Sequence, residues 1–286
     1  MNSLILGSGF GLYGYLPGVS TFCKFIYLDI KYKEKFFCRK ELKKFSYKIK
    51  WYDNIAKIIN DVNYVIIAKK PKDQFKIIKS LNLKKKNKHL FLEKPISNNP
   101  KNSLLIIKYL KKKKIKYSFG FLFEYLSWYK LLKKKISKNG KIKILWYVKK
   151  NKENNNWKYI VSQGGGSLRY YGIHLIKIIF DLKFLNLKSN FISANLWRSL
   201  FLDNKKNILE VDFKITNKEK FKIIYNNKIL INSMNPFQKL LNSKKIDPRV
   251  SILKKYIKQN LSNRSARYEK YDRFIYFWDK IEKYYI

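Results

Sequence analysis

The chain is poor in the residues that build several kinds of functional site. Its 286 residues include only 2 cysteines, Cys23 and Cys38. Two thiols are too few for a disulfide framework or a thiolate metal site, so a reducing cytoplasm is the expected location. The 2 histidines, His89 and His174, exclude a multi-histidine metal centre. No run approaches the roughly 18 to 20 apolar residues of a membrane span, and the N-terminus lacks the basic head and cleavage site of a signal peptide. We expect a soluble, unprocessed protein without a membrane partner.

Acidic residues are also scarce, with 19 Asp and Glu against 64 Lys and Arg, which gives a formal net charge of +45. Such an excess is typical of proteins that bind nucleic acid or anionic membranes. However, only 7 of the 64 basic residues are arginine, the residue that phosphate and base recognition favours, and the lysines are spread along the whole chain. We therefore do not expect a nucleic-acid partner, and polyanion binding remains the least favoured alternative.

The hydrophobic pattern predicts two domains of different construction. Up to about residue 120, short apolar runs alternate with helical patterns, which indicates a doubly wound parallel sheet. The helical segments 71–81 and 100–110 both open with proline. The runs that fit buried strands are 3–6, 24–29, 48–52, 64–68, 89–93 and 115–121.

From about residue 140, strands follow one another without helices between most of them, at 141–148, 191–199, 208–216 and 220–226. Alternating polarity over 209–215 predicts a strand with one solvent-exposed and one buried face, as in antiparallel sheets. The polar segment 149–166 is predicted to be a long loop. The fold class is therefore α/β, with a Rossmann domain over 1–120 and an α+β domain with a mostly antiparallel open sheet over 121–286. The final helix is a candidate to pack back on the first domain.

A glycine-rich turn follows the first strand and opens a helix that is expected to end near Pro17 and Gly18. In this context the glycines allow a tight turn and close approach of a pyrophosphate, whose oxygens the first helical amides can hold. The third glycine of a GxGxxG pattern falls on Leu12 when the pattern is read from Gly7, and on Gly14 when it is read from Gly9. A purely structural glycine turn is the alternative. The predicted dinucleotide-binding residues here are Gly7, Ser8, Gly9, Phe10, Gly11 and Leu12.

Asp29 closes the second strand, where a carboxylate can accept hydrogen bonds from the adenosine ribose and repel a 2′-phosphate. NAD is therefore favoured over NADP. Lys31 and Lys33 keep NADP open because they could neutralise that phosphate, and Asp29 could instead be a simple turn residue.

Glu93, Lys94 and Pro95 end the fifth strand. The carboxyl ends of strands in an open α/β sheet face the ligand crevice, so Lys94 is expected to face a cofactor. A lysine in that place can exchange a proton with a substrate hydroxyl or carbonyl while hydride moves at the adjacent carbon.

Three consecutive glycines, 164–166, precede a helical pattern that carries Tyr170, His174 and Lys177 on one side. A lone histidine on a mostly apolar helix is more often a core residue than a functional one. The sequence therefore makes His174 a candidate only.

These features, in this order, resemble the Gfo/Idh/MocA oxidoreductase family. Further matching segments are Leu16-Pro17, 68–71, Gly120-Phe121 and Trp157-Lys158. The resemblance implies a Rossmann domain that binds NAD or NADP, with Ala68, Lys69 and Glu93 also at the cofactor. It implies that Lys94 lies between nicotinamide and substrate, and that His174 is the catalytic or substrate-binding histidine. It also implies a sugar-like or cyclitol substrate, and oligomerisation through the open sheet of the second domain.

The chain departs from the family pattern at several positions. Aspartates usual in the family are replaced by Tyr170 and Lys177, a frequent histidine by Gln74, and a frequent arginine by Glu124. We therefore hypothesise an NAD(P)-dependent oxidoreductase in which Lys94, His174 and Tyr170 are catalytic. A non-catalytic dinucleotide-binding or substrate-binding protein is the alternative.

Overall fold

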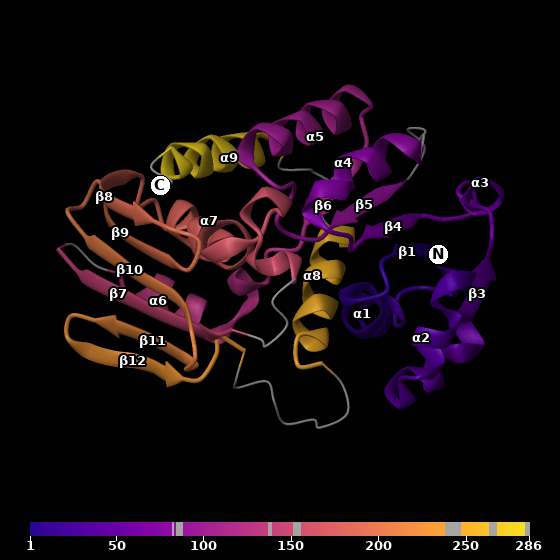
Figure 1. The fold of residues 1–286 in the computed structure, drawn as a ribbon, viewed down its shortest axis with the longest axis horizontal. Helices are drawn as coiled ribbons and strands as arrows, with labels where there is room; N and C mark the ends of the chain where they lie inside the picture. The colour runs from indigo at the N-terminus through magenta and orange to yellow at the C-terminus, as the bar shows by residue number, and fades with distance from the viewer. Residues whose placement is uncertain are drawn as a thin grey trace. The chain divides into compact units, whose positions relative to one another are not determined.

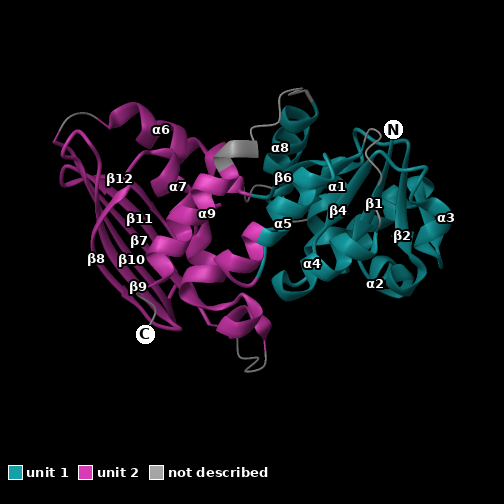
Figure 2. Cartoon of the chain, turned by 90° about the horizontal axis from the view of Figure 1, so that it is seen from above, with its two compact units in different colours: residues 1–97, 105–120, 239–268 teal, residues 98–104, 121–238, 269–286 magenta. Residues whose placement is uncertain are grey.

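The computed structural model describes residues 1–81, 83, 88–136, 139–150, 156–237, 247–262 and 268–283. The chain forms two compact units, coloured separately in Figure 2. Unit 1 comprises residues 1–97, 105–120 and 239–268, and unit 2 comprises residues 98–104, 121–238 and 269–286. The predicted division into a cofactor domain over 1–120 and a substrate domain over 121–286 concerns function as well as packing, and stays a prediction.

Unit 1 is built on sheet A, whose six strands run in the order β3-β2-β1-β4-β5-β6 with every pairing parallel. The strand order turns back between β1 and β4, and ligands of doubly wound sheets bind at the carboxyl ends of the strands beside such a point. All six predicted runs form strands, which confirms the Rossmann prediction. Their bounds are β1 (Asn2–Leu6), β2 (Phe25–Asp29), β3 (Ile49–Tyr52), β4 (Tyr64–Ile67), β5 (His89–Leu92) and β6 (Lys116–Phe119).

The two predicted helices α4 (Pro71–Ser80) and α5 (Pro100–Lys112) begin where the sequence predicts. Pro71 and Pro100 occupy the first positions of α4 and α5, where a missing amide hydrogen costs nothing. The helix after the glycine turn ends at Val19, one residue beyond Gly18 and near the predicted end, and Gly18 lets α8 approach α1 closely (Figure 1). The helical segments are η1 (Gly11–Tyr15, a π-helical turn), α1 (Leu16–Val19), η2 (Ile30–Tyr32), α2 (Lys33–Phe37), η3 (Lys40–Lys48), α3 (Ile55–Ile58), α4 (Pro71–Ser80), α5 (Pro100–Lys112, whose residues 100–104 belong to unit 2) and α8 (Val250–Ser262).

Unit 2 is built on sheet B, in the order β12-β11-β7-β10-β9-β8. Only the β10–β7 pairing is parallel among those of the described strands, so the predicted mostly antiparallel sheet is confirmed. The predicted alternation holds along β10, where Val211 and Phe213 are buried and Glu210 and Asp212 are partly exposed. The strands are β7 (Lys141–Lys149), β8 (Asn186–Ile192), β9 (Leu196–Leu202), β10 (Ile208–Thr216), β11 (Lys220–Tyr225) and β12 (Lys228–Ser233).

Two strand predictions for sheet B were wrong. The segment 191–199 is not one strand, because a tight turn closed by the Ser193 amide and the Leu196 carbonyl (2.8 Å) separates β8 from β9. Strand β12 was not predicted. It pairs with β11 through the two-residue turn Asn226-Asn227, in which both residues have positive φ, as a hairpin turn of this length requires.

The helices of unit 2 include the buried α7, in which every residue from Ile173 to Phe180 is buried. Within the predicted loop 149–166, residues 151–155 lie outside the described residues, and two short 3₁₀ turns occupy part of the rest. The helical segments are η4 (Leu122–Tyr125), α6 (Ser127–Lys135), η5 (Trp157–Tyr159), η6 (Val161–Gln163), η7 (Ser167–Gly172, a π-helical turn), α7 (Ile173–Asp181) and α9 (Tyr268–Glu282).

Candidate functional site

The glycine turn follows the buried strand β1 at the point where the strand order turns back. Gly7 has φ +145°, and a Cβ there would lie 2.3 Å from the Ala68 carbonyl oxygen, so only glycine fits beside the end of β4. A Cβ on Gly11 would lie 3.1 Å from Ile5 Cγ2. The close helix–strand approach that the third glycine of the pattern usually allows is therefore made at Gly11, one residue before Leu12.

Gly9 differs from its neighbours because a Cβ there would meet no atom within 4 Å. Its carbonyl accepts hydrogen bonds from the amides of Leu12 (2.9 Å) and Tyr13 (3.3 Å), which marks the start of the helix. The amides of Phe10 and Gly11 precede the first complete turn and lack a carbonyl one turn earlier. An exposed glycine followed by such amides fits a dinucleotide pyrophosphate, and these residues would hold it.

Leu12 and Phe10 line the turn in different ways. Leu12 is fully buried, so its side chain belongs to the core of unit 1. The Phe10 ring packs over Gly14, where a Cβ would lie 2.2 Å from the ring, and edge-on to Tyr15. The Arg249 guanidinium lies 4.1 Å from the centroid of the same ring and is held by Asp247 through two side-chain hydrogen bonds of 2.9 and 2.7 Å. The sequence offers no signal for this contact between the glycine turn and the residues just before α8.

At the end of β2, Asp29 makes local contacts typical of a turn-capping residue. Its carboxylate accepts a hydrogen bond from the Lys31 amide (3.1 Å) and pairs with Lys31 Nζ at 2.5 Å. The hydrogen bond with Asp29 raises the pKa of Lys31. Nearby, Lys69 Nζ donates to Tyr32 Oη at 2.7 Å. Asp29 is thus a turn-capping residue, and its carboxylate also stands at the carboxyl edge of the sheet.

At the end of β5, the Glu93 amide extends the ladder to β4 by donating to the Ile67 carbonyl (2.9 Å). The Glu93 carboxylate accepts a hydrogen bond from Tyr15 Oη at 3.0 Å. Burial raises the pKa of Glu93, an effect that the Lys94 charge and the Tyr15 hydrogen bond oppose. Burial also raises the pKa of Tyr15, and the Glu93 charge raises it further. Gly120 leaves room for this pair, since a Cβ would lie 2.7 Å from Tyr15 Oη and 2.9 Å from Glu93 Oε2.

Lys94 follows directly and is joined to Pro95 by a cis peptide bond. Strands β1, β4 and β5 are neighbours in sheet A, so Gly7, Ala68 and Glu93 end at one edge. Unit 1 therefore gathers the glycine turn, the Ala68 strand end and Lys94, as the sequence predicts for residues that share a ligand.

The three glycines of unit 2 lead into a π-helical turn. Gly164 and Gly166 have φ of 91° and 87°, and a Cβ on Gly165 would lie 2.3 Å from the Trp157 carbonyl oxygen. The glycines therefore allow the chain to pass against the backbone of Trp157 and Lys158 before the helix begins. The helix begins directly after them, as predicted.

Tyr170 and His174 occupy different surroundings within unit 2. Tyr170 is partly buried, with its ring 5.1 Å from that of Trp157 and 5.6 Å from Lys158 Nζ. His174 is 6% exposed and stacks on Phe123 with the ring centroids 4.3 Å apart and the planes at 6°. Aromatic packing therefore fixes the plane of the imidazole ring.

One turn beyond His174, Lys177 is buried and forms ion pairs with Asp181 and, at 3.9 Å, with Glu124. A buried ammonium group requires such partners. Glu124 belongs to η4, which also carries Phe123, so the acid that replaces a frequent arginine of the family pairs here with the lysine that replaces an aspartate.

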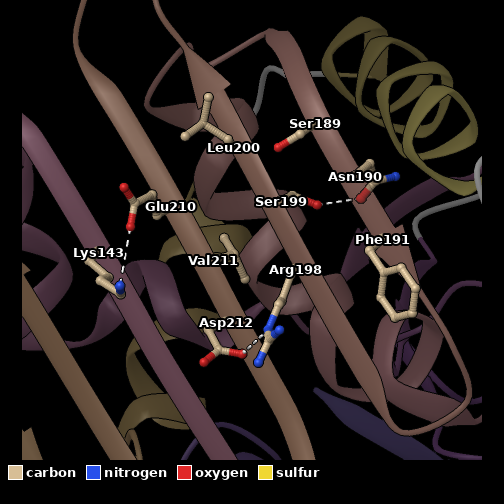
Figure 3. Close-up of a pocket in the computed structure, with 10 residues that line it drawn as sticks. All are labelled: Lys143, Ser189, Asn190, Phe191, Arg198, Ser199, Leu200, Glu210, Val211 and Asp212. Atoms are coloured by element: carbon tan, nitrogen blue, oxygen red, sulfur yellow. Dashed lines mark hydrogen bonds and ion pairs between the residues drawn. The ribbon is translucent and has the colours of Figure 1, made fainter.

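The outer face of sheet B carries a cavity of about 460 Å³, shown in Figure 3. Its charged side chains are paired along the sheet, Arg198 with Asp212 at 3.2 Å and Lys143 with Glu210 at 3.4 Å. Paired surface charges of this kind are typical of a polar, solvent-exposed sheet face and not of a catalytic site. The lining residues are Lys143, Ser189, Asn190, Phe191, Arg198, Ser199, Leu200, Glu210, Val211 and Asp212.

Metal binding and membrane insertion find no support in the described residues. Those residues contain no group of three or more histidine, cysteine or acidic side chains able to hold a metal ion. No helix in the described ranges is long and apolar enough to cross a membrane.

Residues 32–121, which include β3 to β6 and the Glu93-Lys94-Pro95 segment, match the Gfo/Idh/MocA family, described as an oxidoreductase family with an NAD-binding Rossmann fold. The predicted resemblance to this family is confirmed. No curated protein is significantly similar to the chain in sequence.

Solved structures of dehydrogenases share the fold of the whole chain. The WlbA dehydrogenase from Thermus thermophilus, solved with NAD and UDP-GlcNAcA, has a TM-score of 0.71 at 10% identity, covering 100% of this chain and 94% of its own. A 3-ketoreductase from Actinomadura kijaniata, solved with NADP and TDP-benzene, has a TM-score of 0.71 at 11% identity over 100% and 98% of the two chains. The dehydrogenase MviM from Clostridium difficile has a TM-score of 0.67 at 14% identity over 99% and 98%. These likenesses show the fold alone.

Proposed function

We propose that the chain is a nicotinamide-dependent oxidoreductase that acts on a hydroxyl or keto group of a sugar, a cyclitol or a nucleotide sugar. The observation that carries the proposal is the glycine turn. The close contact with Ala68 requires a glycine at position 7. Gly9 is exposed, and a Cβ there would meet no atom within 4 Å. Packing explains Gly7, and a ligand that must approach the backbone explains Gly9. The family match supports the cofactor class.

The proposed cofactor is NAD. The backbone of residues 7–11 would hold its phosphates, and the nicotinamide would supply hydride transfer when bound. Asp29 closes β2, and its carboxylate would accept hydrogen bonds from ribose hydroxyls and repel a 2′-phosphate. Lys31, paired with that carboxylate, is the residue through which NADP would be accommodated.

Lys94 is the proposed proton-transfer residue. In the oxidative direction its neutral amine takes the proton of the substrate hydroxyl while the carbon gives up a hydride. In the reductive direction the ammonium group returns that proton to the carbonyl oxygen. The Lys94 charge lowers the pKa of the neighbouring Glu93 carboxyl group, which opposes the rise that burial causes.

His174 and Tyr170 are the proposed substrate-binding residues. The imidazole of His174, whose plane is fixed by stacking, offers a nitrogen suited to a hydroxyl group. Tyr170 offers a phenol whose unperturbed pKa of about 10 differs greatly from that of the aspartate it replaces, so it donates hydrogen bonds rather than accepting protons at neutral pH.

The test is Lys94→Ala beside Lys94→Arg in an assay against a panel of sugars, cyclitols and nucleotide sugars. We expect Lys94→Ala to lose at least about 100-fold in kcat with NADH affinity nearly unchanged, as for the loss of a general acid–base. Lys94→Arg keeps the charge but cannot release its proton, so it should be similarly inactive. Turnover by both variants at the wild-type rate would remove Lys94 from the mechanism.

A non-catalytic dinucleotide-binding protein is the second candidate, favoured by the buried ion pairs of Lys177 and the 6% exposure of His174. It predicts tryptophan quenching by NADH without turnover of any panel member. Steady turnover would exclude it.

We also propose that the outer face of sheet B joins copies of the chain. Its rows of paired charges and the exposed Phe191 ring suit a face that meets its own copy. Light scattering on Arg198→Glu tests this, because reversing the charge beside Asp212 should reduce the mass to that of one chain.

The free thiols of Cys23 and Cys38 suit a cytoplasmic location, which stays a prediction.

A further inference from the structure

Gln74 lies in α4 with none of its surface exposed. Its side-chain nitrogen donates two hydrogen bonds, to the Glu93 carbonyl at 2.9 Å and to the Pro95 carbonyl at 2.8 Å. These two carbonyls belong to the residues on either side of Lys94. One buried amide group therefore holds the backbone before and after the proposed proton-transfer residue.

The chemistry of the amide explains why glutamine stands here. An NH₂ group carries two hydrogens, and both are used by the two carbonyls. A histidine nitrogen has one hydrogen at most, and an aliphatic side chain would leave both carbonyls without this donor. Gln74 Oε1 is buried and has no hydrogen-bond partner among the described residues. A buried acceptor without a partner destabilises the fold. The favourable contribution of Gln74 therefore comes from the two hydrogen bonds that its side-chain nitrogen donates.

Two further contacts fix the same strand exit from other sides. The Glu93 amide donates to Ile67 in β4, and Tyr15 holds the Glu93 carboxylate. The residues on both sides of Lys94 are therefore anchored to α4, and Glu93 is also anchored to β4 and to the helix after the glycine turn. Because a lysine side chain has four rotatable carbons, the place of its amine depends on a fixed backbone.

We propose that Gln74 is a positioning residue for Lys94: its double hydrogen bond holds Lys94 where a bound nicotinamide cofactor covers the amine. The inference rests on the proposed function, and it assigns to Gln74 no contact with cofactor or substrate. Loss of the two bonds should release Lys94 while leaving the glycine turn, and with it cofactor affinity, in place.

The test measures peptide-resolved acetylation rates of Lys94 with and without saturating NADH, which needs no substrate. Gln74→Leu removes both donors at similar volume. Ile78→Ala, a buried residue one turn further along α4, is the control for stability lost through this helix. We expect NADH to slow acetylation of Lys94 at least about fivefold in the wild type and in Ile78→Ala, against less than about twofold in Gln74→Leu. NADH affinity should stay within about threefold in all three.

If NADH slowed acetylation of Lys94 as strongly in a folded, NADH-binding Gln74→Leu variant as in the wild type, the inference would be overturned. The proposed function would remain intact. Absence of protection in the wild type would overturn the proposed role of Lys94 and the inference with it.

Should Gln74→Leu fail to fold, Gln74→Glu provides the second arm, because a carboxyl group donates only when it is protonated. Its NADH protection ratio should then be larger at acidic than at alkaline pH. A ratio equal to that of the wild type across the range would also overturn the inference.

Discussion

Two Gly→Ala substitutions in the glycine turn, each adding one methyl group, distinguish its role in packing from its role in ligand binding. In Gly7→Ala the new Cβ would lie 2.3 Å from the Ala68 carbonyl oxygen, at a φ of +145° that alanine rarely adopts. Backbone strain of about 1–3 kcal/mol and overpacking of similar size make a loss of about 3 kcal/mol the expected result. In a unit of this size, that loss corresponds to a fall in Tm of roughly 5–10 °C.

Gly9→Ala is the matched change, because its Cβ would meet no protein atom within 4 Å and its φ lies outside the left-handed range. Its effect on unfolding should stay within about 0.5 kcal/mol. The methyl group would nevertheless occupy space that a pyrophosphate needs, so NADH affinity should fall at least about tenfold, or about 1.4 kcal/mol.

Thermal unfolding by circular dichroism and NADH titration by fluorescence measure the two quantities on the same samples. A Gly9→Ala protein that melts like the wild type and also binds NADH with wild-type affinity would refute the reasoning, because the open space above Gly9 would then not be the place of the cofactor.

Three further predictions concern other parts of unit 1. Burial lowers the pKa of His89 to about 4, so its stabilising contribution is complete above about pH 6.5 and is lost as the pH falls toward 4. Denaturant titrations should show that the wild type loses about 2 kcal/mol more than His89→Gln between about pH 7 and pH 5, and equal losses would contradict the prediction. Asp29→Ser should shift the ratio of NADH to NADPH affinity toward NADPH at least about tenfold by calorimetry, and an unchanged ratio would leave Asp29 as a turn residue only. Gly120→Ala should lower Tm by several degrees, since its Cβ would lie 2.7 Å from Tyr15 Oη, whereas an unchanged Tm would show that Tyr15 and Glu93 can separate without cost.

Much of the fold could be predicted because its signals are local. Parallel strands are buried on both faces and appear as short apolar runs, as at 64–68, and Pro71 and Pro100 mark helix starts. The β8–β9 turn was missed although Ser193 and Asn195 are residue types common in turns, because no glycine or proline accompanies them in this short segment. The Asn226-Asn227 pair did carry a hairpin signal that could have revealed β12.

For the candidate site, the sequence could predict the residues that belong to motifs but not the side-chain contacts between them. The positions of Gly7, Glu93 and Lys94 at strand ends follow from strand order. The contacts of Gln74 with carbonyls about twenty residues away have no periodicity in the sequence, and neither has the Tyr15 hydrogen bond. Such side-chain contacts depend on which helix packs against which strand, and only the folded chain shows them.

The central claim is that the turn after β1 binds a nicotinamide dinucleotide, and calorimetry of the full chain against NADH and NADPH tests it most directly. The account predicts one saturable site per chain, tighter for NADH than for NADPH, that is lost in Gly9→Ala. The absence of saturable binding by either nucleotide to the folded wild-type protein would contradict it.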